Sequence, residues 1–170
     1  MFQEEVGLVC NASKAKVNLL KNNPAGYFLA SLFGGMYIGF GILLIFTAGG
    51  ILNAAGSPAT KIVMGACFGV ALSLVVIAGA ELFTGNNFVM TVGLYRKEVT
   101  FKDTLVLWVV CWIGNLLGAV ILGVLYHVTG LAGGPVGEFI AKTSEAKMAV
   151  SFFPLLTRGI LCNILVCIAV

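Results

Sequence analysis

Charge is the scarcest property of this chain. Only 10% of its 170 residues are Asp, Glu, Lys or Arg, and residues 22–60 carry no charge at all. Soluble domains normally contain about 25% charged residues. Together with 59% hydrophobic residues and a mean hydropathy of +1.04, this composition excludes an ordinary soluble domain. It also lacks the basic stripe with interleaved aromatic residues that would indicate nucleic-acid binding.

Catalytic side chains are scarce as well. The chain has one histidine, His127, and one acidic residue inside its apolar stretches, Glu81. It therefore offers no Ser-His-Asp arrangement and no carboxylate pair. The five cysteines show no metal-ligand spacing. We predict no enzyme activity, no metal and no cofactor, with a membrane enzyme kept as an alternative class.

Long apolar stretches are what the chain has in abundance. Four of them, residues 27–52, 62–95, 104–128 and 148–170, each meet the length of about 20 residues needed to cross a bilayer. Basic residues gather before the first stretch and between the second and third. By the positive-inside rule, the N-terminus and the loop 95–103 are expected in the cytoplasm. The protein is expected to be a multi-pass protein of the inner (plasma) membrane.

The N-terminal segment is polar but carries apolar residues at near-helical spacing: Val6, Val9, Cys10, Val17 and Leu20. This pattern predicts a short amphipathic helix that lies on the membrane surface. Residues 1–23 are thus expected to form a cytoplasmic N-terminal helix, and residues 24–170 the transmembrane domain.

The second apolar stretch is too long for one straight helix. Residues 62–95 would reach about 50 Å as a helix, whereas the hydrocarbon core is about 30 Å thick. Their only charge, Glu81, lies in the glycine-flanked segment 79–85. We predict that the helix breaks there, at a depth where irregular backbone survives only if it is buried in protein or lines a cavity. Channels and transporters place their substrates at such breaks.

Bulky apolar side chains surround the predicted break. Phe68 and Leu72 share a helix face that leads toward it, and Leu82 and Phe83 follow in the non-helical part. Two interpretations stay open, since these side chains either narrow a pore and strip water from a solute or pack in the core.

Polar residues at the break predict its electrostatics. Thr84 is expected to cap a second half-helix, whose positive end would then face the midplane and favour an anion. Glu81 is expected to accept backbone N–H groups freed by the break rather than to transfer a proton.

Two further patterns concern helix contacts. Asn163 shares a face with Val166, Cys167 and Val170, so its amide either contacts a solute or joins two helices. Glycines at small-xxx-small spacing occur at residues 35/39, 65/69 and 114/118. Such pairs indicate close packing, either inside one subunit or between subunits.

The segment 78–85, AGAELFTG, resembles the broken second helix of the formate/nitrite transporter family. Residues 22–27, 35–39 and 159–167 fall where other signatures of that family fall. The resemblance runs in order over almost the whole chain. It implies an all-α, aquaporin-like helical bundle that assembles as a pentamer, with one pore per subunit for small monovalent anions.

The resemblance also implies roles for individual residues. Leu82, Phe83 and Thr84 would form the central constriction, and Phe68 and Leu72 would line the cytoplasmic side. Asn163 and Val166 would face the pore from the fourth helix. Lys147 would attract anions in the outer vestibule and help their protonation. The signatures look most like the nitrite branch, while formate and hydrosulfide channels share the same pore plan.

The resemblance implies six spans in two inverted halves, with a pore histidine on a broken fifth helix. This sequence includes four of the six spans and not that histidine; His127, near the end of the third span, matches no family site. A piece of a longer protein and a shortened gene product are both open interpretations. A scaffold or interaction subunit that does not transport is the alternative to a channel.

Overall fold

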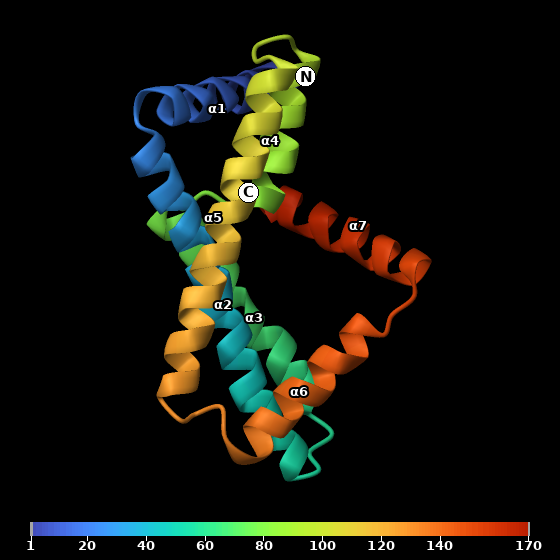
Figure 1. The fold of residues 1–170 in the computed structure, drawn as a ribbon. Helices are drawn as coiled ribbons and strands as arrows, with labels where there is room; N and C mark the ends of the chain where they lie inside the picture. Colours follow the sequence, from blue (N-terminus) through green and yellow to red (C-terminus); the bar gives the residue numbers. More distant parts are fainter. Residues whose placement is uncertain (1, 170) are drawn as a thin grey trace.

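The structure, a computed structural model, describes residues 2–169, and in that range it consists of helices joined by short loops (Figure 1). The helices are α1 Gln3–Asn22, α2 Pro24–Ala54, α3 Thr60–Ala78, α4 Phe83–Tyr95, α5 Phe101–Val128, α6 Gly134–Met148 and α7 Phe152–Ala169. Among them α2, α3, α5 and α7 are long and apolar enough to cross a membrane. The predicted all-α membrane fold is confirmed. Met1 and Val170, which belong to the predicted first and last segments, lie outside the described residues.

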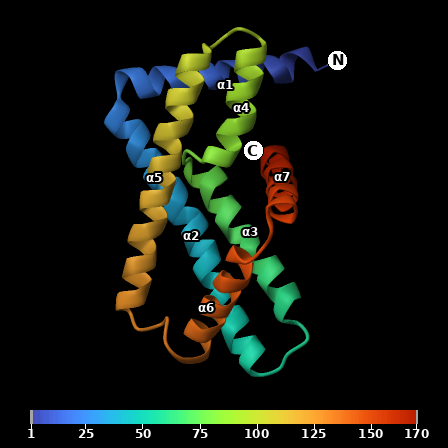
Figure 2. The ribbon, with the colours of Figure 1, turned by 45° about the vertical axis from the view of Figure 1, so that its right-hand side comes forward.

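Helices α2, α3 and α5 form the centre of the bundle (Figures 1 and 2). Helix α1 lies across the end of the bundle from which α4 and α5 emerge, and α6 packs against α2 near the opposite end. Helix α7 projects from the side of the bundle and contacts α4. The two ends of the molecule are therefore capped by helices that are polar, whereas the middle is made of apolar ones.

The second span is broken, as predicted. Helix α3 ends at Ala78, residues 79–82 are irregular, and α4 begins at Phe83. Gly79 ends α3 in the left-handed region, with φ 73°, and its N–H bonds to the Val75 carbonyl at 3.2 Å. A side chain at this φ would be strained, so glycine suits the turn that stops the helix.

The start of the second half-helix differs from the prediction. Phe83 and Thr84 were expected in or at the edge of the loop, with Thr84 as the cap, but both lie in the first turn of α4. Leu82 occupies the N-cap position in extended backbone, and no side chain of its own helix caps it. The expectation of a threonine cap was wrong because another helix supplies the hydrogen-bond acceptor, as the site geometry below shows.

Glycines allow α2 and α5 of one subunit to pack closely against each other. A Cβ on Gly35 would overlap the Asn115 backbone, and one on Gly118 would overlap the Leu32 carbonyl. A Cβ on Gly114 would likewise meet the Ser31 side chain. Of the two interpretations of these glycine pairs, the structure supports internal packing for the α2 and α5 pairs. On α3, by contrast, Gly65 and Gly69 have open space beside them.

The amphipathic helix α1 packs part of its apolar face against the helix bundle. Val17 belongs to the buried cluster that also contains Tyr27, Met90 and Leu107, and Cys10 is buried as well. Helix α1 thus contacts α4 and α2. The spacing of its apolar residues indicated a buried face but not this protein partner, and its position on the membrane surface stays a prediction.

The segment between the third and fourth spans is a helix rather than a loop. Helix α6 starts with Pro135 in its first turn and packs Val136 against Gly50 of α2. The last helix begins at Phe152, four residues later than the predicted Met148.

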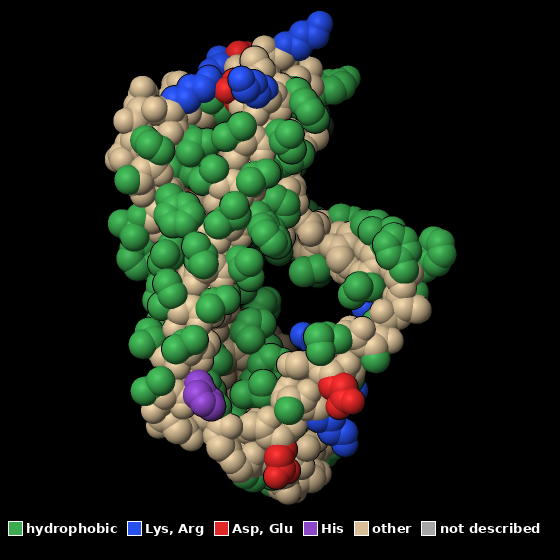
Figure 3. Space-filling model, in the orientation of Figure 1, with side chains coloured by type: hydrophobic (Ala, Val, Ile, Leu, Met, Phe, Trp, Pro, Cys, Tyr) green, Lys and Arg blue, Asp and Glu red, His purple; other side chains and the backbone are tan. Residues whose placement is uncertain are grey.

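The surface agrees with a multi-pass membrane protein. In Figure 3 charged side chains gather at the α1 end and around α6, while hydrophobic side chains cover the band between them. Large apolar residues are exposed along α5 and α7, for example Trp112, Val120, Leu161 and Leu165. Such an extended apolar surface would be a liability in water but is what a bilayer requires.

Candidate functional site

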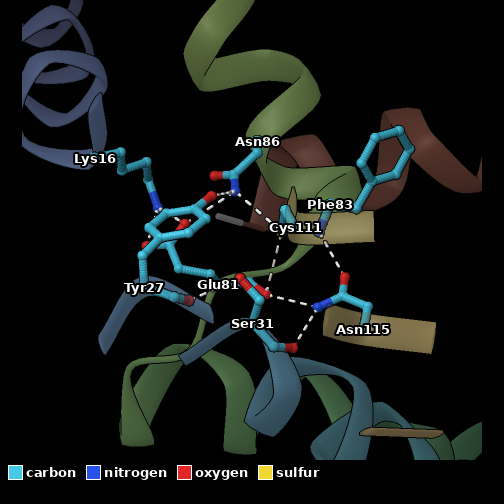
Figure 4. Close-up of polar contacts among 8 residues, drawn as sticks. All are labelled: Lys16, Tyr27, Ser31, Glu81, Phe83, Asn86, Cys111 and Asn115. Atoms are coloured by element: carbon cyan, nitrogen blue, oxygen red, sulfur yellow. Dashed lines mark hydrogen bonds and ion pairs between the residues drawn. The ribbon is translucent and has the colours of Figure 1, made fainter. Parts of the chain in front are cut away.

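The backbone of the break is held by hydrogen bonds from two other helices (Figure 4). The Glu81 N–H donates to the Ala30 carbonyl of α2 at 3.2 Å. Asn115 of α5 then uses both ends of its side-chain amide. Its Nδ2 donates to the Glu81 carbonyl at 2.8 Å, and its Oδ1 accepts the Phe83 N–H at 2.9 Å. Irregular backbone inside a membrane needs such partners, because lipid offers none.

The Glu81 carboxylate forms an ion pair with Lys16 of α1. The Lys16 ammonium lies 2.6 Å from Oε1 and 2.7 Å from Oε2, and the Asn86 amide donates to Oε2 at 2.9 Å. The expectation that this carboxylate accepts backbone N–H groups was wrong. A lysine from the end of the bundle reaches it instead, so the break and the N-terminal helix are electrostatically linked.

Asn86 anchors α4 to its neighbours. It is 1% exposed, and Tyr27, which is 0% exposed, accepts a hydrogen bond from its Nδ2 through the phenol oxygen at 3.1 Å. Trp108 Nε1 of α5 donates to the Asn86 carbonyl at 3.2 Å. The first turns of α4 are thereby fixed against α2 and α5, and the half-helix cannot rotate without breaking these bonds.

Leu82, Phe83 and Thr84 line one cavity of about 440 Å³ beside the break. The other lining residues come from α2 and α5 and are almost all apolar: Gly35, Ile38, Gly39, Ile42, Leu43, Trp112, Asn115, Ala119, Leu122 and Gly123. None of the lining residues is charged. The structure thus brings the three predicted constriction residues together in an apolar environment.

Asn163 lines a different cavity, of about 980 Å³, between α4 and α7. Asn87 of α4 donates from Nδ2 to Asn163 Oδ1 at 3.1 Å, so this asparagine joins two helices. The Cys167 thiol lies 3.6 Å from the Thr84 carbonyl and brings α7 to the first turn of α4. Val166 is half-buried on α7 and is not among the residues that line either cavity.

Phe68 and Leu72 lie on α3, between the α2–α3 loop and the break. They are on the opposite side of the break from α1 and line neither cavity. If α1 lies in the cytoplasm, Phe68 and Leu72 therefore cannot also lie on the cytoplasmic side of the break. Lys147 lies in the last turn of α6, far from α1, with its ammonium 5.7 Å from the centre of the Phe46 ring.

The residues that sequence reasoning missed are Asn115, Lys16 and Asn86. Asn115 is the only amide side chain in the third apolar stretch, and it stands beside Gly114 and near Gly118. That isolated amide on a glycine-rich face was a usable signal, since polar side chains in membrane helices usually bond across to another helix. Lys16 gave no such signal, because its distance from Glu81 in sequence, 65 residues, hides the contact.

Comparison with known proteins supports this arrangement. A family model described as formate/nitrite transporter matches residues 3–170. This chain belongs to the formate/nitrite transporter family. A solved structure of an ion channel of this family (FNT) has a TM-score of 0.71 and 37% sequence identity, and the match covers 76% of this chain and 51% of that one.

Two similar proteins are a nitrite transporter and a formate channel. The nitrite transporter NirC of Escherichia coli is 39% identical over 100% of this chain and 63% of its own length. The formate channel BtFdhC of Bacillus thuringiensis is 37% identical over 95% of this chain and 62% of its own length. The chain thus spans less than two thirds of the length of these relatives. Members of this family are transporters and channels rather than enzymes.

Proposed function

We propose that this protein is a channel for small monovalent anions, with nitrite as its first substrate and formate and hydrosulfide as further candidates. The nitrite transporter and the formate channel among its relatives support the substrate class. The chain covers the part of the family fold that contains the broken second helix, so the proposal concerns the wall of the pore that this part forms.

One observation carries the proposal: a half-helix starts at the break, with its first turn at an apolar cavity. The first N–H groups of a helix have no intrahelical partner, and the positive end of the helix dipole favours an anion. The Phe83 N–H already donates to the Asn115 side chain, and the next two backbone N–H groups, of Thr84 and Gly85, belong to the same turn. A monovalent anion would be attracted to this turn without a fixed positive side chain that would hold it too tightly.

Protonation eases passage in this proposal. A bare anion loses its hydration in an apolar slit, which costs far more than burying a neutral polar molecule. Leu82 and Phe83 line the cavity, and none of its lining residues is charged. Helix dipole and Lys147 offset only part of the cost, because exposed charge is screened. The solute therefore crosses the slit more readily as its neutral conjugate acid.

Orientation follows from the basic residues in this proposal. Three lysines lie on α1, and Arg96, Lys97 and Lys102 lie in or beside the α4–α5 loop at the same end. The positive-inside rule places this end in the cytoplasm of a cell whose plasma, or inner, membrane holds the protein. Lys147 then lies on the outer side, and Phe68 and Leu72 in the outer half of the pore. We propose a homopentamer, as the resemblance implies.

Flux through proteoliposomes tests the proposal. The protein is reconstituted and the uptake of nitrite, formate and chloride is compared with uptake by protein-free liposomes of the same lipid. We expect protein-dependent uptake of nitrite and formate. Equal uptake with and without protein would favour the non-transporting scaffold instead.

A further inference from the structure

We propose that Asn115 is a positioning residue for the constriction: its amide fixes the backbone of the break and thereby sets where Leu82 and Phe83 stand. The part of this inference that concerns selectivity rests on the proposed channel function, whereas the part that concerns the backbone does not.

Asn115 uses nearly all of its hydrogen-bonding capacity on backbone groups. Its Nδ2 donates to the Glu81 carbonyl at 2.8 Å and to the Ser31 carbonyl of α2 at 2.6 Å. Its Oδ1 accepts the Phe83 N–H at 2.9 Å. One side chain therefore joins α2, α5 and both ends of Leu82, the residue between Glu81 and Phe83. An amide is required, because the site needs two donors and one acceptor on a short stem.

The surroundings of Asn115 leave it little freedom. Gly35 of α2 lies against the Asn115 backbone, and a Cβ on Gly34 would overlap the Glu81 carbonyl. The two neighbouring glycines thus let α2 approach both the clamp and the break. Figure 4 shows the Asn115 amide between Ser31 and the break, while the Phe83 ring points away from the polar groups. The backbone is fixed on one side, and the apolar side chains are presented on the other.

Few other groups hold this backbone. Glu81 N–H is bound by the Ala30 carbonyl, and the Cys111 thiol is 3.5 Å from the Glu81 carbonyl. A thiol is a weak donor, so it cannot replace the amide. Loss of the Asn115 amide would leave the Glu81 carbonyl and the Phe83 N–H without a strong partner in the membrane, and the break would shift to find others.

Hydrogen–deuterium exchange of the break tests the clamp without relying on transport. Asn115→Leu keeps the approximate volume and removes both kinds of hydrogen bond. We expect the peptide that covers residues 79–85 to exchange about tenfold faster or more, the equilibrium equivalent of one lost buried hydrogen bond. Leu107→Ala is the control, since it removes a buried side chain from the same helix, about two turns away, that makes no hydrogen bond to the break. Unchanged exchange at residues 79–85 in Asn115→Leu, or an equal increase in Leu107→Ala, would overturn the inference.

Asn115→Asp supplies a second test if the leucine variant does not fold. An ionised carboxylate still accepts the Phe83 N–H but donates nothing to the two carbonyls, whereas the neutral acid has one O–H that donates. The protection factor of residues 79–85 in this variant should therefore rise as the pH falls, relative to the parent protein at each pH. A protection factor that equals that of the parent protein at every pH would contradict the clamp.

Transport adds the functional readout. We expect Asn115→Leu to lose discrimination between nitrite and glycerol in proteoliposomes, with Leu107→Ala retaining it. Faster exchange at the break with unaltered discrimination would overturn the selectivity role of Asn115. Absence of nitrite flux in the parent protein would count against the proposed function, and the exchange experiment would still decide the clamp.

Discussion

Glu81 is a charged side chain placed at the middle of a membrane span, and its neighbours explain how the fold tolerates it. An acidic residue at mid-bilayer costs about 2.5–3.5 kcal/mol on insertion scales. The Lys16 ammonium and the Asn86 amide both bind the carboxylate, whose side chain is 13% exposed, against 22% for that of Lys16. The pair is neutral as a whole, so the break carries no net charge that would repel an anion.

Removing one charge of the Lys16–Glu81 pair should lower the stability of the protein more than removing both charges. We expect Lys16→Met to destabilise the protein by about 1–3 kcal/mol, because it leaves a mostly buried carboxylate without its cation. Adding Glu81→Gln to the same variant should restore part of that stability, since no charge is then left unpaired. Thermal unfolding in detergent measures both variants.

Lys14→Met provides the matched control for Lys16→Met. Lys14 lies on the same helix α1 and pairs with Glu98 of the α4–α5 loop, and both side chains are more than 40% exposed. An exposed pair contributes about 0–1 kcal/mol, so this variant should unfold close to the parent protein. A larger loss for Lys14→Met than for Lys16→Met would contradict the proposed importance of the pair at the break.

Leu82 and Phe83 are expected to exclude hydrated solutes. Both line the apolar cavity at the break. Replacing both by alanine would widen this part of the pore and admit water. The pore would then discriminate less between small solutes and larger or hydrated ones. The variant Leu82→Ala with Phe83→Ala should therefore leak glycerol and chloride, which we expect the parent protein to exclude. Retained discrimination in proteoliposomes would mean that the constriction lies elsewhere.

At the residue scale, the sequence predicted the place of the break but not what holds it. Glycines and a lone acid in an overlong apolar stretch are local signals, and they located residues 79–82 to within a few positions. The cap was assigned to Thr84 because local rules consider only the helix's own residues. The real acceptor, Asn115, is 32 residues away from Phe83, so only the packing of α5 reveals it.

At the scale of helices, the glycines of α2 and α5 set the distance between the two. We expect Gly118→Ala to destabilise the protein by about 1–3 kcal/mol, because its Cβ would overlap the Leu32 carbonyl and force the helices apart. Gly123→Ala on the same helix is the control. It has open space around it, so alanine should be neutral or stabilise by up to about 1 kcal/mol through helix propensity.

Thermal unfolding in detergent compares the two glycine variants directly. If Gly118→Ala and Gly123→Ala unfold together, the close approach of α2 and α5 at Gly118 contributes nothing to stability. That result would also weaken the account of the clamp, since Asn115 reaches Ser31 only because the two helices are close.

Hydropathy predicted the spanning helices well and the other helices poorly. Each predicted apolar stretch contains a helix, because a backbone in lipid must satisfy its own hydrogen bonds. Helix α6, Gly134–Met148, mixes charged and apolar residues, so hydropathy predicted no helix there. Pro135 in its first turn is a start signal that hydropathy ignores.

At the scale of the whole molecule, the exposed apolar surfaces need to be covered. Helix α7 contains no buried residue and touches the bundle mainly through α4. Lipid or other protein helices must cover its apolar side chains in a membrane. We expect native mass spectrometry of the detergent-solubilised protein to show five copies. A monomer or dimer as the only species would contradict the proposed pentamer.

The overall fold could be predicted because membrane insertion restricts a chain to few arrangements. What each apolar helix face packs against could not be predicted. Composition identified the membrane class, and the resemblance gave the family to which the chain belongs. Amphipathic spacing in α1 indicated a buried face but not that Val17 packs on Tyr27 and Met90. Burial by lipid and burial by protein give the same apolar pattern, so coordinates are needed to separate them.

Nitrite uptake as a function of external pH tests whether the solute passes the break as its neutral acid. The protein is reconstituted in proteoliposomes, and uptake by protein-free liposomes is subtracted at each pH, because the neutral acid also crosses lipid. We expect protein-dependent uptake that rises as the external pH falls, since the apolar slit at Leu82 and Phe83 favours the protonated solute. Protein-dependent uptake that stays constant across the pH range would show that protonation does not control passage.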